Sequence, residues 1–170
     1  MSLESKITEV RTFFKRCGVQ MGEKKVEGGH VFYGGFNVEN EKDVSLLVRL
    51  ILDDPEPWLR MIVAFPVFSN SCDRLSQISE LLARVNFRLN FGRFEVNFDN
   101  GQVRFTSCQE LCVLEASDKQ GILYRQFFGA IAISQRFYQY LKRVVCDSEA
   151  PNVASAEFRN ESVRKRPASQ

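Results

Sequence analysis

Cysteine and histidine side chains are the best candidates in this chain for nucleophilic or metal chemistry. The chain has five cysteines, at positions 17, 72, 108, 112 and 146, and a single histidine, His30. A Cys–His nucleophile needs its two side chains within hydrogen-bond reach, and no signature around any cysteine predicts that contact. Cys108 and Cys112 have C-x3-C spacing without a second pair or a nearby histidine, whereas a zinc site takes four ligands. We therefore expect an exposed histidine in a turn, buried thiols in strands, and no catalytic, cofactor or metal site.

Two acidic segments contain residue types that could hold a cation. Asp53, Asp54 and Glu56 flank two prolines between apolar runs. Carboxylates that converge can bind divalent cations or perform acid–base catalysis, but beside prolines we expect a solvated turn. Residues 99–101 (DNG) match part of a calcium loop, yet the other ligand positions and the final glutamate of such a loop are missing. We interpret this tripeptide as a hairpin turn.

Glycine pairs occur at positions 28–29 and 34–35, within the mixed segment from Val19 to Val38. Such pairs are found in phosphate-binding loops. Neither pair here leads into a Gly-Lys-Ser/Thr ending or lies between a strand and a helix. We interpret both pairs as turns that flank a short strand from Val31 to Tyr33.

Arginines are interleaved with phenylalanines between positions 84 and 105. The set comprises Arg84, Arg88, Arg93 and Arg104 with Phe87, Phe91, Phe94 and Phe105. Such a mixture can bind single-stranded nucleic acid, because rings stack on bases and cations contact phosphates. On alternating strands, however, the two kinds of side chain point to opposite faces. With a net charge of only +2, this disfavours nucleic acid as a partner. A small-ligand or single-stranded nucleic-acid binding protein stays the alternative function.

The composition is that of an ordinary globular protein with an apolar core. The chain has 170 residues, of which 44% are hydrophobic and 26% charged, and 15 of them are phenylalanine. We expect phenylalanines mainly to fill the core, with an apolar interface as the alternative. The N-terminus shows no signal peptide, and no apolar run approaches the ~20 residues needed to cross a bilayer. Together with the odd, scattered cysteines, this predicts a cytoplasmic setting and no membrane partner.

Apolar stripes with helical spacing predict three helices, over residues 3–17, 72–85 and about 117–145. Ser2 or Ser5 is suited to cap the first helix and Gly18 to end it. Residues 146–170 contain few apolar side chains and a basic cluster. We therefore expect a single α+β domain over residues 1–145, followed by a disordered tail.

A β-hairpin is predicted directly after the second helix. Phe94, Val96 and Phe98 alternate with polar residues, which is the period of a strand with one buried face. Asn100 and Gly101 tolerate positive φ at both central positions of a turn, which favours a two-residue type I′ turn. A second alternating strand follows that turn.

Two further strands, Val44 to Leu52 and Trp58 to Phe68, are predicted from nearly continuous apolar runs. Such runs indicate burial on both faces, or one face covered by a partner. Pro66 lacks a backbone N–H, so it indicates a strand end, an edge strand or a bulge. The predicted order of elements is α-β-β-β-α-β-β-α, an α+β fold with an antiparallel sheet flanked by helices.

The segment around the hairpin carries a family resemblance. Asn86 and Asn90 form an Asn-x-x-x-Asn stretch after a helix, followed by Phe94 in a strand and the turn at residues 99–101. In these residues the chain resembles the YbjN-like family, whose fold is that of the type III secretion chaperones. The order of elements extends the resemblance over residues 3–145, apart from the glycine-rich segment 22–35.

The resemblance implies a protein without enzymatic activity or cofactor, and often a homodimer. It implies a non-catalytic, chaperone-like or regulatory domain that binds a polypeptide partner through apolar sheet or helix surface. It assigns no site residues.

Overall fold

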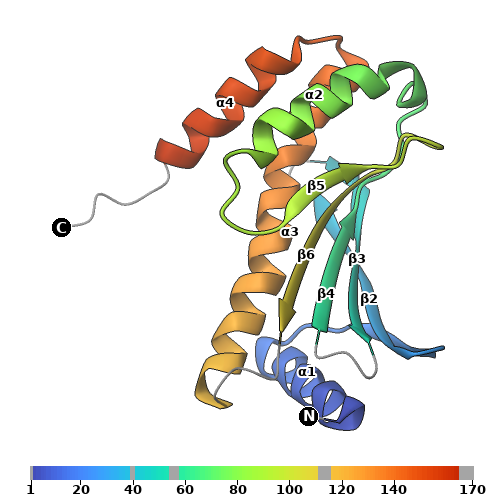
Figure 1. Ribbon diagram of the computed structural model, residues 1–170, viewed down its shortest axis with the longest axis vertical. Helices are drawn as coiled ribbons and strands as arrows, with labels where there is room; N and C mark the ends of the chain where they lie inside the picture. The colour runs from blue at the N-terminus through green and yellow to red at the C-terminus, as the bar shows by residue number, and fades with distance from the viewer. Residues whose placement is uncertain (1, 39–40, 54–57, 111–115, 165–170) are drawn as a thin grey trace.

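The computed structural model describes residues 2–38, 41–53, 58–110 and 116–164. Over these residues the chain forms a six-stranded antiparallel sheet with its helices gathered on one face (Figure 1). The elements are α1 (Leu3–Cys17), β1 (Gly22–Val26), β2 (Gly29–Val38), β3 (Glu41–Asp53), β4 (Trp58–Ala64), the 3-10 turn η1 (Cys72–Arg74), α2 (Leu75–Asn86), β5 (Arg93–Val96), β6 (Val103–Glu110), α3 (Ala116–Cys146) and α4 (Pro151–Arg164). The α+β class predicted from the sequence is confirmed.

The strands lie in the order β1-β2-β3-β4-β6-β5. Helix α3 runs along the sheet, α1 crosses one of its ends, and α2 and α4 lie together at the other end (Figure 1). The order of elements differs from the prediction at two points, because β1 precedes the predicted strands and α4 follows the predicted last helix. The predicted order α-β-β-β-α-β-β-α is therefore incomplete.

Strand β1 comes from the segment that was interpreted as glycine-rich turns. Gly28 has a φ of +70° and lies in the tight turn that joins β1 to β2, so the first glycine pair does mark a turn. The second pair, at positions 34–35, lies inside β2 and pairs with Val48 and Leu47 of β3. The short strand predicted at residues 31–33 is therefore part of a longer one. An exposed edge strand such as β1 needs no apolar run, so no pattern indicated it.

The core fills the space between the sheet and the helices, and the other sheet face is open. In β3 the buried side chains alternate with exposed ones, as in a sheet covered on one side. Leu46, Val48, Leu50 and Leu52 are buried, whereas Leu47 on the opposite face is 40% exposed. The sequence left open whether these strands are buried on both faces; the described residues cover one face of the sheet.

Helix α1 begins and ends where the sequence predicted. The Ser2 hydroxyl accepts a hydrogen bond from the Ser5 N–H, and Gly18 closes the helix with a φ of 65°. Val10 and Phe13 of its apolar stripe are almost completely buried. Pro66 lies just after the end of β4, so of the three positions predicted for it (a strand end, an edge strand or a bulge) the structure shows the strand end.

Helix α4 contradicts the prediction of a disordered tail over residues 151–164. Pro151, Ala154 and Phe158 are buried, and their spacing places them on one side of the helix. The Phe158 ring packs edge-on against Phe137 and Tyr140 of α3. Two or three well-placed apolar contacts suffice because α2 and α3 already offer a surface, which composition does not reveal.

The hairpin is present, but its turn is not of type I′. The Asn97 N–H donates to the Gln102 carbonyl, and the Gly101 N–H donates to the Asn97 carbonyl. Gly101 has positive φ whereas Asn100 does not, so four residues rather than two form the loop. The Asn97 side chain also accepts from the Asp99 N–H, a local turn that competes with the shorter one. Phe98 lies in this loop and is 65% exposed, so its predicted burial is wrong.

Asn86, the first asparagine of the Asn-x-x-x-Asn stretch, closes the outer edge of the sheet. Its side-chain amide donates to the Phe94 carbonyl and accepts from the Phe94 N–H, both at 2.8 Å. A neighbouring strand would make the same pair of bonds. The end of α2 therefore holds β5 in place and occupies the backbone of that edge strand at Phe94.

We expect Asn86→Ala to lower the free energy of unfolding by about 1–3 kcal/mol, because both backbone groups of Phe94 lose their partner. Urea unfolding followed by circular dichroism measures the loss. Asn90→Ala is the matched control, since Asn90 is exposed and belongs to the same stretch; it should change stability by less than about 0.5 kcal/mol. Equal effects of the two substitutions would contradict this role of Asn86.

Candidate functional site

A groove of about 780 Å³ lies between the end of α2, the following loop, α3 and α4. Its lining includes Arg84, Arg88, Arg136 and Arg159 together with Phe87, Phe91 and Phe158. We name it the arginine–phenylalanine groove after these seven residues. The first wall follows from how α2 ends: the N–H groups of Phe87 and Arg88 donate to the Ala83 and Val85 carbonyls, so the backbone keeps turning past Asn86.

Two phenylalanine rings give the groove its apolar surface. Phe87 is 82% exposed, the highest value among the large hydrophobic side chains that the structure describes. Phe91 is 39% exposed and packs edge-on against the buried Phe105 ring. A Cβ at Gly129 would lie 3.2 Å from Phe91 Cζ, so this glycine of α3 makes room for the Phe91 ring.

The charges in the groove are all positive among the lining residues that the structure describes. Arg84 is paired with Glu80, Nε to Oε1 at 2.8 Å, on the same helix. Arg88 lies over the Phe87 ring at 5.5 Å from its centre. Within the described ranges of the chain, neither Arg88 nor Arg159 forms an ion pair. The groove therefore carries an excess of positive charge next to apolar rings.

Arg136 lies deepest among these arginines. Its guanidinium stacks over the Phe158 ring at 4.3 Å from the centre. Its Nε is buried and has no hydrogen-bond partner among the described residues. Burial lowers the pKa of Arg136, and the Glu161 carboxylate raises it only in part. The group stays charged at neutral pH, since an arginine does not lose its proton in a protein.

Glu161, the carboxylate that interacts electrostatically with Arg136, is also bonded to another side chain. It forms a hydrogen bond with Tyr140, and burial together with this carboxylate raises the pKa of Tyr140 to about 12. The charge of Arg136 is therefore only partly compensated within the described part of the chain. An incoming anion would meet a guanidinium that has already lost part of its water.

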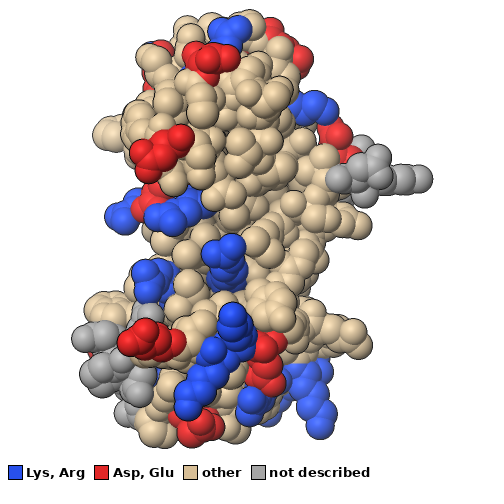
Figure 2. Space-filling model, turned by 90° about the vertical axis from the view of Figure 1, so that its right-hand side faces the viewer, with Lys and Arg blue, Asp and Glu red and all other residues tan. Residues whose placement is uncertain are grey.

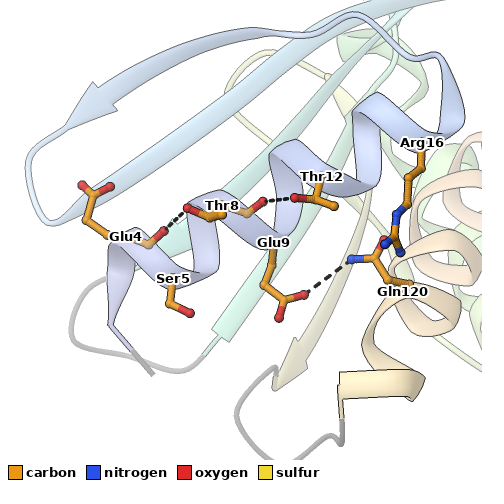
Figure 3. Close-up of a pocket in the computed structure, with 7 residues that line it drawn as sticks. All are labelled: Glu4, Ser5, Thr8, Glu9, Thr12, Arg16 and Gln120. Atoms are coloured by element: carbon orange, nitrogen blue, oxygen red, sulfur yellow. Dashed lines mark hydrogen bonds between the residues drawn. The ribbon is translucent and has the colours of Figure 1, made fainter.

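A second hollow lies between α1 and Gln120 of α3, and several of its polar side chains are hydrogen-bonded within the protein (Figure 3). The hydroxyls of Thr8 and Thr12 donate to helix carbonyls one turn earlier, those of Glu4 and Thr8. The Gln120 amide donates to Glu9. Because these polar groups already have partners within the protein, we interpret the hollow as a polar surface and not as a ligand-binding site.

The residues that the sequence singled out for chemistry do not converge. His30 is buried rather than exposed, and its Nε2 lies 3.1 Å from Glu23 Oε2. The same carboxylate binds Arg11, which ties α1 to β1 and β2. Cys108 is exposed, contrary to its predicted burial, because it lies on the open face of β6. Here tertiary packing overrides the expectation from local sequence.

Other predicted positions fall partly outside the described ranges. Cys112, Asp54 and Glu56 lie outside the described ranges. Asp53 is the last residue of β3. Residues 99–101 form the hairpin loop. The described residues contain no cluster of three or more side chains suited to hold a metal ion.

The interleaved arginines and phenylalanines separate into two groups. On the strands, Phe94 and Phe105 are buried, while Arg93 and Arg104 are exposed and both bind Glu95. Partial burial would raise the pKa of Glu95, but its hydrogen bonds to the two arginines lower it overall. The prediction of opposite faces is confirmed for this group.

The second group belongs to the groove, which sequence reasoning missed. Arg84, Arg88, Phe87 and Phe91 lie in a helix end and a loop, where strand alternation does not apply. The available signal was the spacing of Arg84 and Arg88, four positions apart at the end of a predicted helix. Their partners Arg136 and Arg159 come from distant segments and carried no signal.

The open sheet face is a second exposed surface, where apolar side chains lie beside arginines, one of which, Arg104, pairs with Glu95. We define it by Tyr33, Leu47, Arg49, Ile51, Arg60, Ile62 and Arg104. Figure 2 views the molecule from this side and shows a broad neutral surface, with Lys and Arg side chains interspersed with Asp and Glu over its lower half. Tyr33 and Leu47 are 46% and 40% exposed.

No family model, curated protein or solved structure matches the chain. Among the described residues, no helix is long and apolar enough to cross a membrane.

Proposed function

We propose that the protein is a non-catalytic, chaperone-like or regulatory domain that binds a polypeptide partner in the arginine–phenylalanine groove. The observation that carries the proposal is the Phe87 ring, 82% exposed at the edge of a groove lined by further rings. Removing such a ring from water is worth about 1.5–3 kcal/mol, which a partner would gain on binding. Rings with arginines beside them are the usual anchors of protein interfaces.

The character of the lining supports binding rather than catalysis. The described lining of the groove holds no histidine, cysteine, carboxylate, lysine or tyrosine that could act as a general acid or base. Ser155 is its only hydroxyl there, and this hydroxyl donates to the Asn152 carbonyl of its own helix. We therefore assign no reaction to the chain.

A random linear peptide library displayed on phage tests this proposal without knowledge of the natural partner. We expect the protein to enrich a family of peptides, and Phe87→Ser to reduce their retention roughly tenfold. Phe98→Ser is the matched control, since Phe98 is an exposed phenylalanine outside the groove. Absence of enrichment, or equal retention by the Phe87 and Phe98 variants, would refute the proposal.

A separate binding measurement tests the alternative function. Labelled oligodeoxythymidine that binds in the groove and is released by salt would indicate a single-stranded nucleic-acid binding protein. If the protein retains this oligonucleotide and no peptide, the polypeptide-binding function is wrong.

We further propose that the protein acts as a homodimer joined through the open sheet face. Leu47, Ile51 and Ile62 on that face would be covered by the same residues of a second copy. Arg49 would face a like charge of the second copy in such a pair, whereas Arg104 is already paired with Glu95. Salt screens that repulsion while the apolar contact persists, so the dimer should become tighter as ionic strength rises.

Light scattering coupled to size exclusion measures this expectation directly. The mass should shift towards the dimer between about 0.1 M and about 1 M salt. Leu47→Glu should give a monomer, whereas Val67→Glu, at an apolar position 51% exposed outside the strands, should leave the dimer intact. A monomer under all conditions, or a dimer that Leu47→Glu does not change, would exclude this interface.

A cytoplasmic setting belongs to the same proposal. Cys72, Cys108 and Cys146 are free and exposed. Exposed free thiols are best tolerated where the surroundings keep them reduced, which supports this compartment.

A further inference from the structure

We infer that the polypeptide partner of the arginine–phenylalanine groove presents an acidic amphipathic helix, with carboxylates for the arginines and apolar side chains for Phe87 and Phe91. This inference rests on the proposed polypeptide-binding function and specifies the chemistry of the partner. Three observations support it: the positive charge of the groove, the buried Nε of Arg136 that lacks a partner among the described residues, and the hydrogen bonds between Asn86 and the Phe94 backbone in β5.

The charge of the groove selects an anionic partner. Its described lining contains four arginines and no aspartate or glutamate. Among the described residues, Arg84 is the one of these four that forms an ion pair, with Glu80, so Arg88 of the loop after α2 and Arg159 of α4 are available to a partner. Carboxylates of the partner would complete the pairs, and a basic partner would be repelled. The chain's own C-terminal residues Arg164, Lys165 and Arg166 are basic, which argues against that segment as the occupant.

Arg136 makes a carboxylate favourable at the centre of the groove. Its Nε is buried without a hydrogen-bond partner among the described residues, and its guanidinium is held over Phe158. Part of the desolvation of this cation has therefore already occurred in the free protein. A carboxylate reaching it would gain a charge-assisted bond in surroundings that screen charge weakly.

The apolar rings require that the acidic residues share their segment with apolar ones. Phe87 and Phe91 are four positions apart and both line the groove. A helix with apolar side chains three and four positions apart can cover both rings with one face while its flanks carry the acids. A free anion or a polar acidic chain would leave the rings in water.

The edge of the sheet beside the groove disfavours an extended partner. Strand addition would need the free N–H and carbonyl of β5, the strand at the edge. At Phe94 both groups are already bonded to the Asn86 side chain. A partner strand therefore cannot pair with β5 at Phe94, which favours binding through side chains, as a helix in a groove does.

Three designed peptides of about five helical turns test the inference. All carry the same apolar face; their remaining positions are glutamate, glutamine or lysine. Fluorescence anisotropy of labelled peptide measures each affinity. We expect the glutamate peptide to bind roughly tenfold or more tightly than the glutamine peptide, with an affinity that falls as salt rises, and the lysine peptide not to bind.

Variants of the protein separate the charge from the rings. Arg88→Gln and Arg159→Gln, at exposed positions, should together weaken the glutamate peptide roughly tenfold and leave the glutamine peptide unchanged. Arg136→Gln should weaken it similarly, provided that its circular dichroism is native. Phe87→Ser should weaken both peptides. Arg125→Gln, an exposed arginine of α3 outside the groove, is the control and should change neither.

The outcomes test the acidic helical partner separately from the proposed polypeptide-binding function. If the glutamine peptide binds as tightly as the glutamate peptide and Phe87→Ser weakens both, polypeptide binding stands and the acidic partner is wrong. If no designed peptide binds but the phage library yields groove-dependent peptides, the helical acidic partner is wrong. If neither source yields a groove-dependent peptide, both proposals fail.

Discussion

Replacing Phe137 by alanine is expected to lower the free energy of unfolding by about 3–5 kcal/mol, the range for a fully buried phenylalanine. Phe137 has no exposed surface. Its ring stacks on Phe94 of β5 with centres 4.0 Å apart, and meets Phe65 after β4 and Phe158 of α4 edge-on. The substitution would leave a cavity where α3, the sheet and α4 join.

Urea unfolding with a fitted free energy measures the effect of Phe137→Ala. Tyr124→Ala is the matched control, because Tyr124 lies on the same helix and is 56% exposed. The control should change stability by no more than about 0.5 kcal/mol. A loss for Phe137→Ala no larger than that of the control would contradict this packing of α3 and α4.

Gly92→Ala is expected to have the second-largest effect, a loss of about 2–5 kcal/mol in the free energy of unfolding. Gly92 has a φ of +63°, where a side chain costs about 1–2 kcal/mol. In addition, a Cβ would lie 2.2 Å from Phe105 Cζ, in a ring that is completely buried. Forcing that ring aside adds about 1–3 kcal/mol, the usual range for an overpacked core.

Gly28→Ala separates the cost of the positive φ from the cost of the clash with Phe105. Gly28 has a similar φ of +70°, but nothing lies within 4 Å of a Cβ built there. It should therefore show the backbone contribution alone, about 1–2 kcal/mol. The difference between the two variants in chemical denaturation reports the clash with Phe105. Equal losses would mean that the loop before β5 does not pack against Phe105 as described.

Gly92 also links stability to the candidate groove. It directly follows Phe91, whose ring lines the groove and packs on the same Phe105. A displaced Phe105 ring would move Phe91 with it. The glycine is thus needed so that the loop can turn into β5 while Phe91 stays at the surface of the groove.

Helix α1 and the hairpin differ in how well local sequence predicted them, for a physical reason. The ends of α1 depend on a side-chain cap by Ser2 and on the left-handed conformation of Gly18, both set by nearby residues. The hairpin turn was mispredicted because the Asn97 side chain offered its own hydrogen bond to the backbone. Two local signals then competed, and the longer loop with Gly101 at its left-handed position prevailed.

Strand β1 and helix α4 escaped prediction because neither has a pattern of its own. β1 pairs its backbone with β2 while most of its side chains stay in water. α4 buries few residues, and it is stable in that position because Phe137 and Tyr140 present rings to Phe158. For both segments the stabilising partner lies elsewhere in the structure, so composition alone indicated a turn and a tail.

By itself, the sequence determined three of the helices, the cap and the end of α1, the position of the hairpin and the α+β class, because these depend on neighbours along the chain. It also contained the arginines and phenylalanines around α2. Only the tertiary structure brought Arg136 of α3 and Arg159 of α4 to the same groove as Phe87. It also left one sheet face open and closed the edge at Phe94 with Asn86. Such sites depend on contacts between distant segments, whose free energy appears only once the whole core has packed.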